Sequence, residues 1–166
     1  SSVVGVFESV VAVLPIVICF QSLVLDMAGN VGTQSLAVTI RVLMDATLTG
    51  RQKLELVCKE GRIGLLNGLI LGAASCGVVG LYIMLFKAKT AAFAFGISGC
   101  IGVALLLAMA VSSIVGTCVP LLFKKLGVDP AVASGPLITT LNDLTAVVAY
   151  YGLAWLLLIN TFGFGA

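Results

Sequence analysis

Long apolar blocks separated by short polar segments make up most of the chain. Because a transmembrane helix needs about 20 mostly apolar residues, each block is long enough to cross a membrane. We therefore predict an all-α fold: a polytopic transmembrane helical bundle with four spans, forming a single domain over residues 1–166, with a charged cytoplasmic linker at about 45–62. The four predicted spans cover about residues 10–43, 63–86, 91–123 and 131–160.

The first and last blocks each contain a polar interruption. A continuous helix over 10–43 would be about 50 Å long, against a hydrocarbon core of about 30 Å. Such a helix either tilts and projects from the membrane or breaks, and the sequence DMAGNVGTQ at 26–34 favours a break. In the last block Asp129 and Pro130 suit a helix start, and Ser-Gly-Pro at 134–136 interrupts it again. Broken backbone at membrane depth is tolerated where it is buried in protein or lines a wet cavity.

Two aspartates, Asp26 and Asp143, lie inside these apolar blocks. A carboxylate at membrane depth costs on the order of 2.5–3.5 kcal/mol on insertion scales, so it usually faces a polar cavity and has a function. The chain has no histidine, and no lysine or arginine lies within several residues of either aspartate in sequence. A cation from solution is therefore the expected partner of both carboxylates.

Asp26 belongs to a polar stripe. Asp26, Asn30, Thr33 and Gln34 follow the i, i+4, i+7, i+8 spacing of one helix face, and Gly29 and Gly32 leave the helix surface beside them without side chains. One interpretation is a cation path along this face. The alternative is that the glycines and small polar groups form a tight helix-packing face.

Asp143 has a similar setting, because Thr139 precedes it by four residues and Ala146 follows it by three on the same helical face. Mg²⁺ prefers oxygen ligands and gives up water reluctantly, so such oxygens can hold it through its water shell. Alternatively, Asp143 only hydrogen-bonds to a neighbouring helix. The expected metal-binding residues are Asp143, Asp26 and Asn30, and the expected pore-lining residues are Gly29, Thr33, Gln34, Gly135, Thr139 and Ala146.

Composition supports a membrane protein. Only 10% of the residues are charged, against about 25% in soluble domains, and the mean hydropathy is +1.21. The net charge of +2 is too small and too scattered to indicate nucleic acid as a partner. With four spans, one side of the membrane receives most of the basic residues: Arg41, Arg51, Lys53, Lys59, Arg62, Lys124 and Lys125, against Lys87 and Lys89 on the other.

This asymmetry predicts an orientation, because the basic side of a multi-pass protein is the cytoplasmic one. Both ends of the sequence are then expected outside, in a protein integral to the cell membrane. Such a start suggests that at least one span entering from the cytoplasm precedes this sequence.

Two stretches resemble a known family. LDMAGNVGTQSLAVTIR at 25–41 and LGVDPAVASGPLITTLNDLTAVVAYY at 126–151 are similar to the transmembrane domain of the MgtE magnesium channels. The patterns GNxGTQ and DPAxASGPxxTTxxD occur in the same order and at the same separation, and the resemblance covers nearly the whole chain.

This resemblance implies a domain of five spans in which two subunits form one pore from their second and fifth spans. The four spans here would be the second to the fifth, without the first span and the cytoplasmic domains that sense Mg²⁺ and gate the pore. The resemblance also implies that Asp143 matches the pore aspartate that holds hydrated Mg²⁺, and that Asn30 matches a polar residue of the second-span motif. Some members carry glycine at the position of Asp26.

The leading hypothesis is membrane passage of divalent cations, Mg²⁺ in particular, by a homodimer surrounded by lipid. An ion-coupled secondary transporter or exchanger is the alternative, because interrupted helices and a midplane carboxylate are also expected there. A membrane enzyme acting on phospholipid or prenyl diphosphate is a remote alternative. The chain has no Asp-x-x-Asp pair, no histidine and no nucleophile with a recognisable base, so we do not expect an enzyme.

Overall fold

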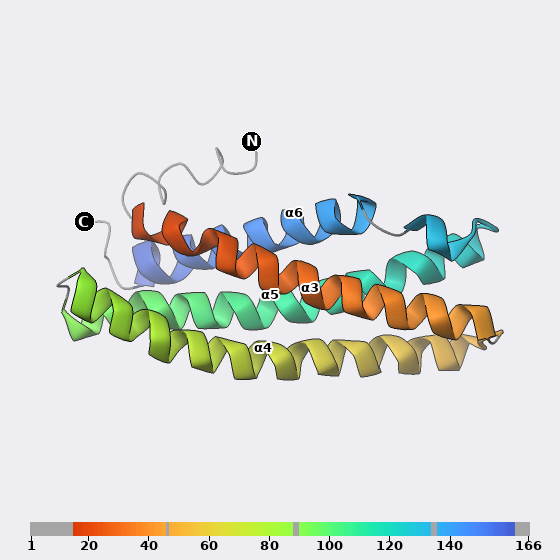
Figure 1. Cartoon of the computed structure of the whole chain (residues 1–166), viewed down its shortest axis with the longest axis horizontal. Helices are drawn as coiled ribbons and strands as arrows, with labels where there is room; N and C mark the ends of the chain where they lie inside the picture. Colours follow the sequence, from red (N-terminus) through yellow and green to blue (C-terminus); the bar gives the residue numbers. More distant parts are fainter. Residues whose placement is uncertain (1–14, 46, 88–89, 134–135, 162–166) are drawn as a thin grey trace.

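Long helices lie side by side in the computed structural model of the chain (Figure 1). The structure describes residues 15–45, 47–87, 90–133 and 136–161. The elements are α3 (Pro15–Asp45), α4 (Gly50–Phe86), α5 (Ala91–Lys125), the 3₁₀ helix η1 (Pro130–Ala133), α6 (Pro136–Leu153) and the π-helix η2 (Ala154–Thr161). All regular structure in these residues is helical, so the predicted all-α bundle is confirmed.

Helix α3 runs without a break through 26–34, so the predicted break in the first block is wrong. A glycine inside a helix costs about 1 kcal/mol relative to alanine, but here the missing side chain makes room for a neighbour. A Cβ on Gly32 would overlap Nδ2 of Asn142 on α6 and lie 2.7 Å from its Cγ. The packing that glycine allows therefore offsets its poor helix propensity.

η1 ends at Ala133 and α6 begins at Pro136, so residues 134–135 of the predicted interruption lie outside the described residues. Asp129 caps the start of η1, where its Oδ1 accepts a hydrogen bond of 2.9 Å from the backbone N–H of Ala131. The π-helix that follows Leu153 has no counterpart in the predicted elements.

Most of the segment predicted as a linker at 45–62 is the first part of α4. A capping box starts this helix: the backbone N–H of Thr49 donates to Oε1 of Gln52 at 2.9 Å, and the N–H of Gln52 donates to Oγ1 of Thr49 at 3.4 Å. With 37 residues, α4 is about 55 Å long. It is therefore longer than a hydrocarbon core of about 30 Å.

Helices α4 and α5 approach each other closely along a row of glycines. A Cβ on Gly68 would lie 2.6 Å from Cα of Leu106, and a Cβ on Gly72 would lie 2.6 Å from the carbonyl oxygen of Gly102. Small residues spaced four apart allow this approach between membrane helices. Both contacts are with backbone, which cannot turn aside as a flexible side chain can.

We expect Gly68→Ala to lower the free energy of unfolding by about 2 kcal/mol, because a methyl group inserted into a filled interface forces the helices apart. Gly77→Ala on the same helix is the matched control, since nothing lies within 4 Å of its Cβ position. Denaturant unfolding of both variants in detergent checks the difference. Equal stability of the two variants would contradict the close packing of α4 on α5.

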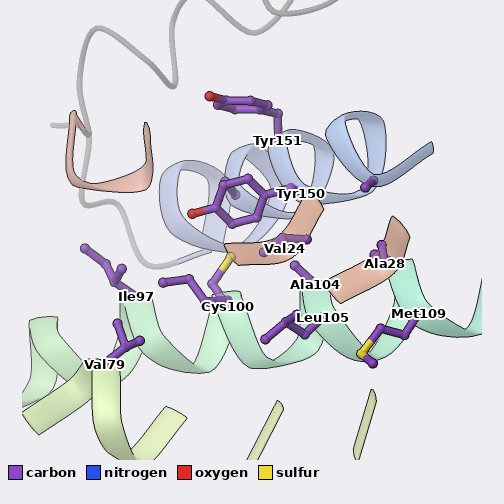
Figure 2. Packing of buried hydrophobic residues seen from close by; sticks show 14 of the residues in the cluster. Val24, Ala28, Val79, Ile97, Cys100, Ala104, Leu105, Met109, Tyr150 and Tyr151 are labelled. Atoms are coloured by element: carbon purple, nitrogen blue, oxygen red, sulfur yellow. The ribbon is translucent and has the colours of Figure 1, made fainter. Parts of the chain in front are cut away.

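The main apolar core lies where α5 packs against α3, α4 and α6. Tyr150 of α6 lies close to Cys100 of α5 and Val24 of α3 in Figure 2, and all three side chains are buried. Hydrogen bonds also join the helices. Ser113 of α5 shares a hydrogen bond of 2.7 Å with Ser35 of α3, and Nζ of Lys124 donates to the carbonyl oxygen of Leu43 at the end of α3.

Within the described residues, α4 and α5 are long and apolar enough to cross a membrane by length and composition. Helices α3 and α6 hold the polar residues of the two sequence motifs. The arrangement with four spans therefore stays a prediction, although α3 and α6 lie beside α5 along the bundle (Figure 1).

Candidate cation-binding groove

A groove of about 320 Å³ lies between α3 and α6. Asp26 of α3 and Asp143 of α6 both line it, and both side chains are exposed. The structure thus brings together the two aspartates that the sequence places far apart. The full lining is Leu25, Asp26, Gly29, Asn30, Thr33, Thr139 and Asp143.

Neither carboxylate of the groove is paired with a basic side chain. In the part of the chain that the structure describes, Arg51 and Glu55 of α4 form the one ion pair, and both are highly exposed. Asp26 and Asp143 therefore keep their negative charge uncompensated by protein. Two such charges in one groove attract a cation and repel an anion.

The hydroxyl of Thr33 is held by the backbone of its own helix. Its Oγ1 lies 2.7 Å from the carbonyl oxygen of Gly29 and 3.0 Å from that of Asn30. Since the hydroxyl proton is directed at these carbonyls, the two lone pairs of Oγ1 remain as acceptors at the groove wall. Gly29 adds no side chain, and nothing lies within 4 Å of its Cβ position.

The other predicted site residues fall in different places. Gln34 is exposed but lies outside the groove lining. Ala146 is not part of the groove lining: it is 0% exposed and belongs to the main core. Three residues after Asp143 the helix has turned by about 300°, which moves Ala146 to the inner edge of that face. Gly135 lies outside the described residues.

Asn142, which the sequence places in the same polar run as Asp143, points the other way. Its side chain is 0% exposed, whereas Asp143 faces the groove. Successive residues of a helix are about 100° apart, and this spacing predicts that the two side chains diverge. It does not predict which of them is buried.

The chemistry of the groove suits a hard cation that keeps its water. Carboxylate, amide and hydroxyl oxygens are the ligands that Mg²⁺ and similar ions accept. In the described part of the chain no group of three or more acidic, cysteine or histidine side chains gathers anywhere. One copy therefore offers two carboxylates, which fits a hydrated ion better than a dehydrated one held in a closed protein cage.

The bundle and the groove define a class of protein: an all-helical membrane domain with a hydrophilic groove suited to a divalent cation. Residues 21–153 match the model of the MgtE family, described as divalent cation transporters. The chain belongs to this family, which confirms the resemblance seen in its two motifs. Because the family is one of transporters, the expectation that the chain is not an enzyme is also confirmed.

Three relatives carry the name magnesium transporter MgtE. The chain is 38% identical over 154 residues to the protein of Enterococcus faecalis, 33% over 153 residues to that of Bacillus subtilis and 34% over 161 residues to that of Thermus thermophilus. These alignments cover 93%, 92% and 95% of this chain, but 32%, 32% and 33% of the relatives. The chain therefore spans about a third of the length of each relative.

Proposed function

We propose that the protein passes divalent cations, Mg²⁺ in particular, through a membrane along the groove between α3 and α6. The observation that carries this proposal is that Asp26 and Asp143 line one groove, exposed and without a basic partner among the described residues. The family of divalent cation transporters supports the class of ion, and the names of the three relatives support Mg²⁺.

A second copy of the chain completes the path in this proposal. The groove of one copy is open, and carboxylates at membrane depth are stable where they face protein or a water-filled cavity. Two copies that place their grooves face to face enclose such a cavity, with Asp26 and Asp143 contributed by each copy. The remaining surface carries many exposed apolar side chains, such as Leu69 and Ile70 of α4, and contacts lipid.

The proposed mechanism needs no dehydration of the ion. Carboxylate oxygens of Asp143 and Asp26 accept hydrogen bonds from the water shell of Mg²⁺, and the oxygens of Asn30 and Thr33 accept further ones. The Coulomb attraction of a doubly charged ion to these carboxylates is twice that of a singly charged ion at the same distance. The site therefore selects divalent over monovalent cations, and it repels anions.

A channel fits the structure better than an ion-coupled carrier. Carriers commonly bind their ions at the ends of broken helices in the middle of the membrane. Helix α3 is continuous past Asp26, so one of the two predicted breaks is absent. Asp143 likewise lies within the regular part of α6.

The basic residues support the proposed orientation. Arg41 near the end of α3, Arg51 at the start of α4 and Lys124 at the end of α5 all belong to helix ends that lie at the same end of the bundle (Figure 1). We place this end at the cytoplasmic surface. The protein then crosses the cell membrane with both ends of this sequence outside.

We expect Asp26→Asn to lower Mg²⁺ uptake into protein-containing liposomes by about threefold to tenfold. This factor corresponds to the loss of roughly 1 kcal/mol of charge-assisted hydrogen bonding between the carboxylate and the water shell of the ion. Asn30 and the carboxylate of Asp143 remain, so uptake is not abolished. Glu55→Gln is the control, because it removes one negative charge from an exposed residue of α4. Unchanged uptake by Asp26→Asn, or an equal loss in the control, would contradict a path along the groove.

A further inference from the structure

Asn142 is buried beside the groove with its hydrogen-bonding capacity unused. The residue is 0% exposed, and within the described part of the chain neither Nδ2 nor Oδ1 has a hydrogen-bond partner. A buried amide without partners is costly. Packing contacts, rather than hydrogen bonds, must therefore hold this side chain in place.

Gly32 of α3 provides the space that this amide fills. A Cβ on Gly32 would overlap Nδ2 of Asn142 and lie 2.7 Å from its Cγ. On the other side of the same residue, a Cβ on Gly116 of α5 would overlap the carbonyl oxygen of Gly32. Gly32 is thus enclosed by backbone from α5 and by the side chain of Asn142 from α6.

Along this face of α3, only the position of Gly32 leaves room for the side chain of Asn142. The residues one turn before and after Gly32 are Ala28 and Leu36, which are 0% and 4% exposed. At both of these positions α3 carries a side chain, whereas at Gly32 it carries none. A slip of α6 by one turn, about 5.4 Å, would press Asn142 against one of them.

The neighbouring contacts agree with this register. The chain directions of α3 and α6 are opposite (Figure 1). Leu36 and Ile138 pack in one small apolar cluster, and Ala28 and Ala146 belong to the main core. On α6, Ile138 and Ala146 are the residues one turn before and one turn after Asn142. The contact of Ile138 with Leu36 therefore lies one turn away from that of Asn142 with Gly32.

We propose that Asn142 is a positioning residue: the shape of its side chain, seated on Gly32, sets the register of α6 on α3 that places Asp143 in the groove. The inference rests on the proposed function, since it assigns to Asn142 the alignment of the proposed cation site. Because Asp143 is the next residue, about 100° around the helix, seating Asn142 inward aims the carboxylate at the groove lined by Asp26.

Two variants of Asn142 separate shape from polarity. Asn142→Ala removes the side chain that fills the space at Gly32, and we expect the Mg²⁺ concentration for half-maximal uptake to rise about tenfold, because small misplacements of a binding group are costly. Asn142→Leu keeps the branch at Cγ and removes the unpaired polar atoms. It is expected to stay within about twofold of the unmodified protein and to melt at a higher temperature. Asn67→Ala on α4 makes the same substitution outside the groove lining and is the matched control, expected to leave the half-maximal Mg²⁺ concentration unchanged.

A second test enlarges the residue on α3 and shortens the one on α6. It does not depend on whether leucine fits in place of Asn142. Gly32→Ala alone is expected to raise the half-maximal Mg²⁺ concentration, because its methyl group meets the amide of Asn142. In the double variant Gly32→Ala with Asn142→Ala, the half-maximal Mg²⁺ concentration is expected to fall most of the way back to that of the unmodified protein. The new methyl group then occupies the space that the side chain of Asn142 has left. Failure of the pair to recover would overturn the inference.

The remaining outcomes are equally decisive. If Asn142→Ala binds and passes Mg²⁺ as the unmodified protein does, or if Asn142→Leu is as impaired as Asn142→Ala, the side chain does not act through its shape. Asp143→Asn in the same assay separates this failure from failure of the proposed function. Loss of uptake in Asp143→Asn with normal Asn142→Ala contradicts the positioning role alone, whereas normal uptake in Asp143→Asn contradicts the cation path itself.

Discussion

Neutralising Asp143 as Asp143→Asn is expected to lower Mg²⁺ uptake about 10- to 100-fold. A hydrogen bond to a charged group contributes about 1.5–3 kcal/mol, and each 1.4 kcal/mol is about tenfold. Asparagine keeps the size of the side chain and its exposure on α6, so the helix packing is unaffected. The loss is expected to exceed that of Asp26→Asn, because Asn30 and Thr33 of α3 remain beside Asp26, whereas α6 contributes only Thr139 beside Asp143.

Asp129→Asn is the matched control for this experiment. It makes the same chemical change, removes the same charge and lies outside the groove. Its side-chain oxygen, which accepts the N–H of Ala131 at 2.9 Å, is retained in asparagine. Uptake by Asp129→Asn should equal that of the unmodified protein. A similar loss in both variants would show that net charge, rather than the groove, controls uptake.

Gly116→Ala is expected to have the largest effect on stability, a loss of about 3 kcal/mol in the free energy of unfolding, at the upper end for inserting a methyl group into a packed core. A Cβ at this position would overlap the carbonyl oxygen of Gly32 and lie 3.1 Å from its carbon. Both groups are backbone inside long helices, so neither can move aside without separating α3 from α5. Unfolding in detergent, followed by circular dichroism, measures this loss.

Gly99→Ala on the same helix is the control for the substitution itself, since nothing lies within 4 Å of its Cβ position. Alanine is the better helix former by about 1 kcal/mol, so this variant should be at least as stable as the unmodified protein. If Gly116→Ala is no less stable than Gly99→Ala, the close contact between Gly32 of α3 and Gly116 of α5 is incorrect.

The sequence predicts the helical bundle well, because long apolar blocks leave few alternatives. It mispredicts α3, where glycines and polar residues at 26–34 indicate a break. The reason is that Gly32 is used for close packing against Gly116 and Asn142, which agrees with the alternative of a tight helix-packing face. Local composition alone does not decide between a break and close packing. The start of α4 was predictable: Thr49 and Gln52 have the spacing of a capping box, although the charged residues that follow favour a linker.

The candidate site was predictable in its chemistry but not in its geometry. Charge in an apolar block singles out Asp26 and Asp143, and helical spacing adds Asn30 and Thr33. Helical spacing cannot decide whether the face of α6 that carries Asp143 extends to Ala146, because that depends on how α6 packs in the main core. The inward position of Asn142 likewise depends on a contact with another helix, the one with Gly32 of α3.

The central claim is that Asp26 and Asp143 hold the same cation. The most direct test is a double-mutant cycle on the Mg²⁺ dissociation constant, obtained from the rise in melting temperature with Mg²⁺ concentration for the unmodified protein, Asp26→Asn, Asp143→Asn and the double variant. If the two carboxylates share one ion, their effects are coupled, and the double variant should bind little more weakly than Asp143→Asn alone. Independent effects that multiply in the double variant, or unchanged Mg²⁺ binding in Asp143→Asn, would contradict the account.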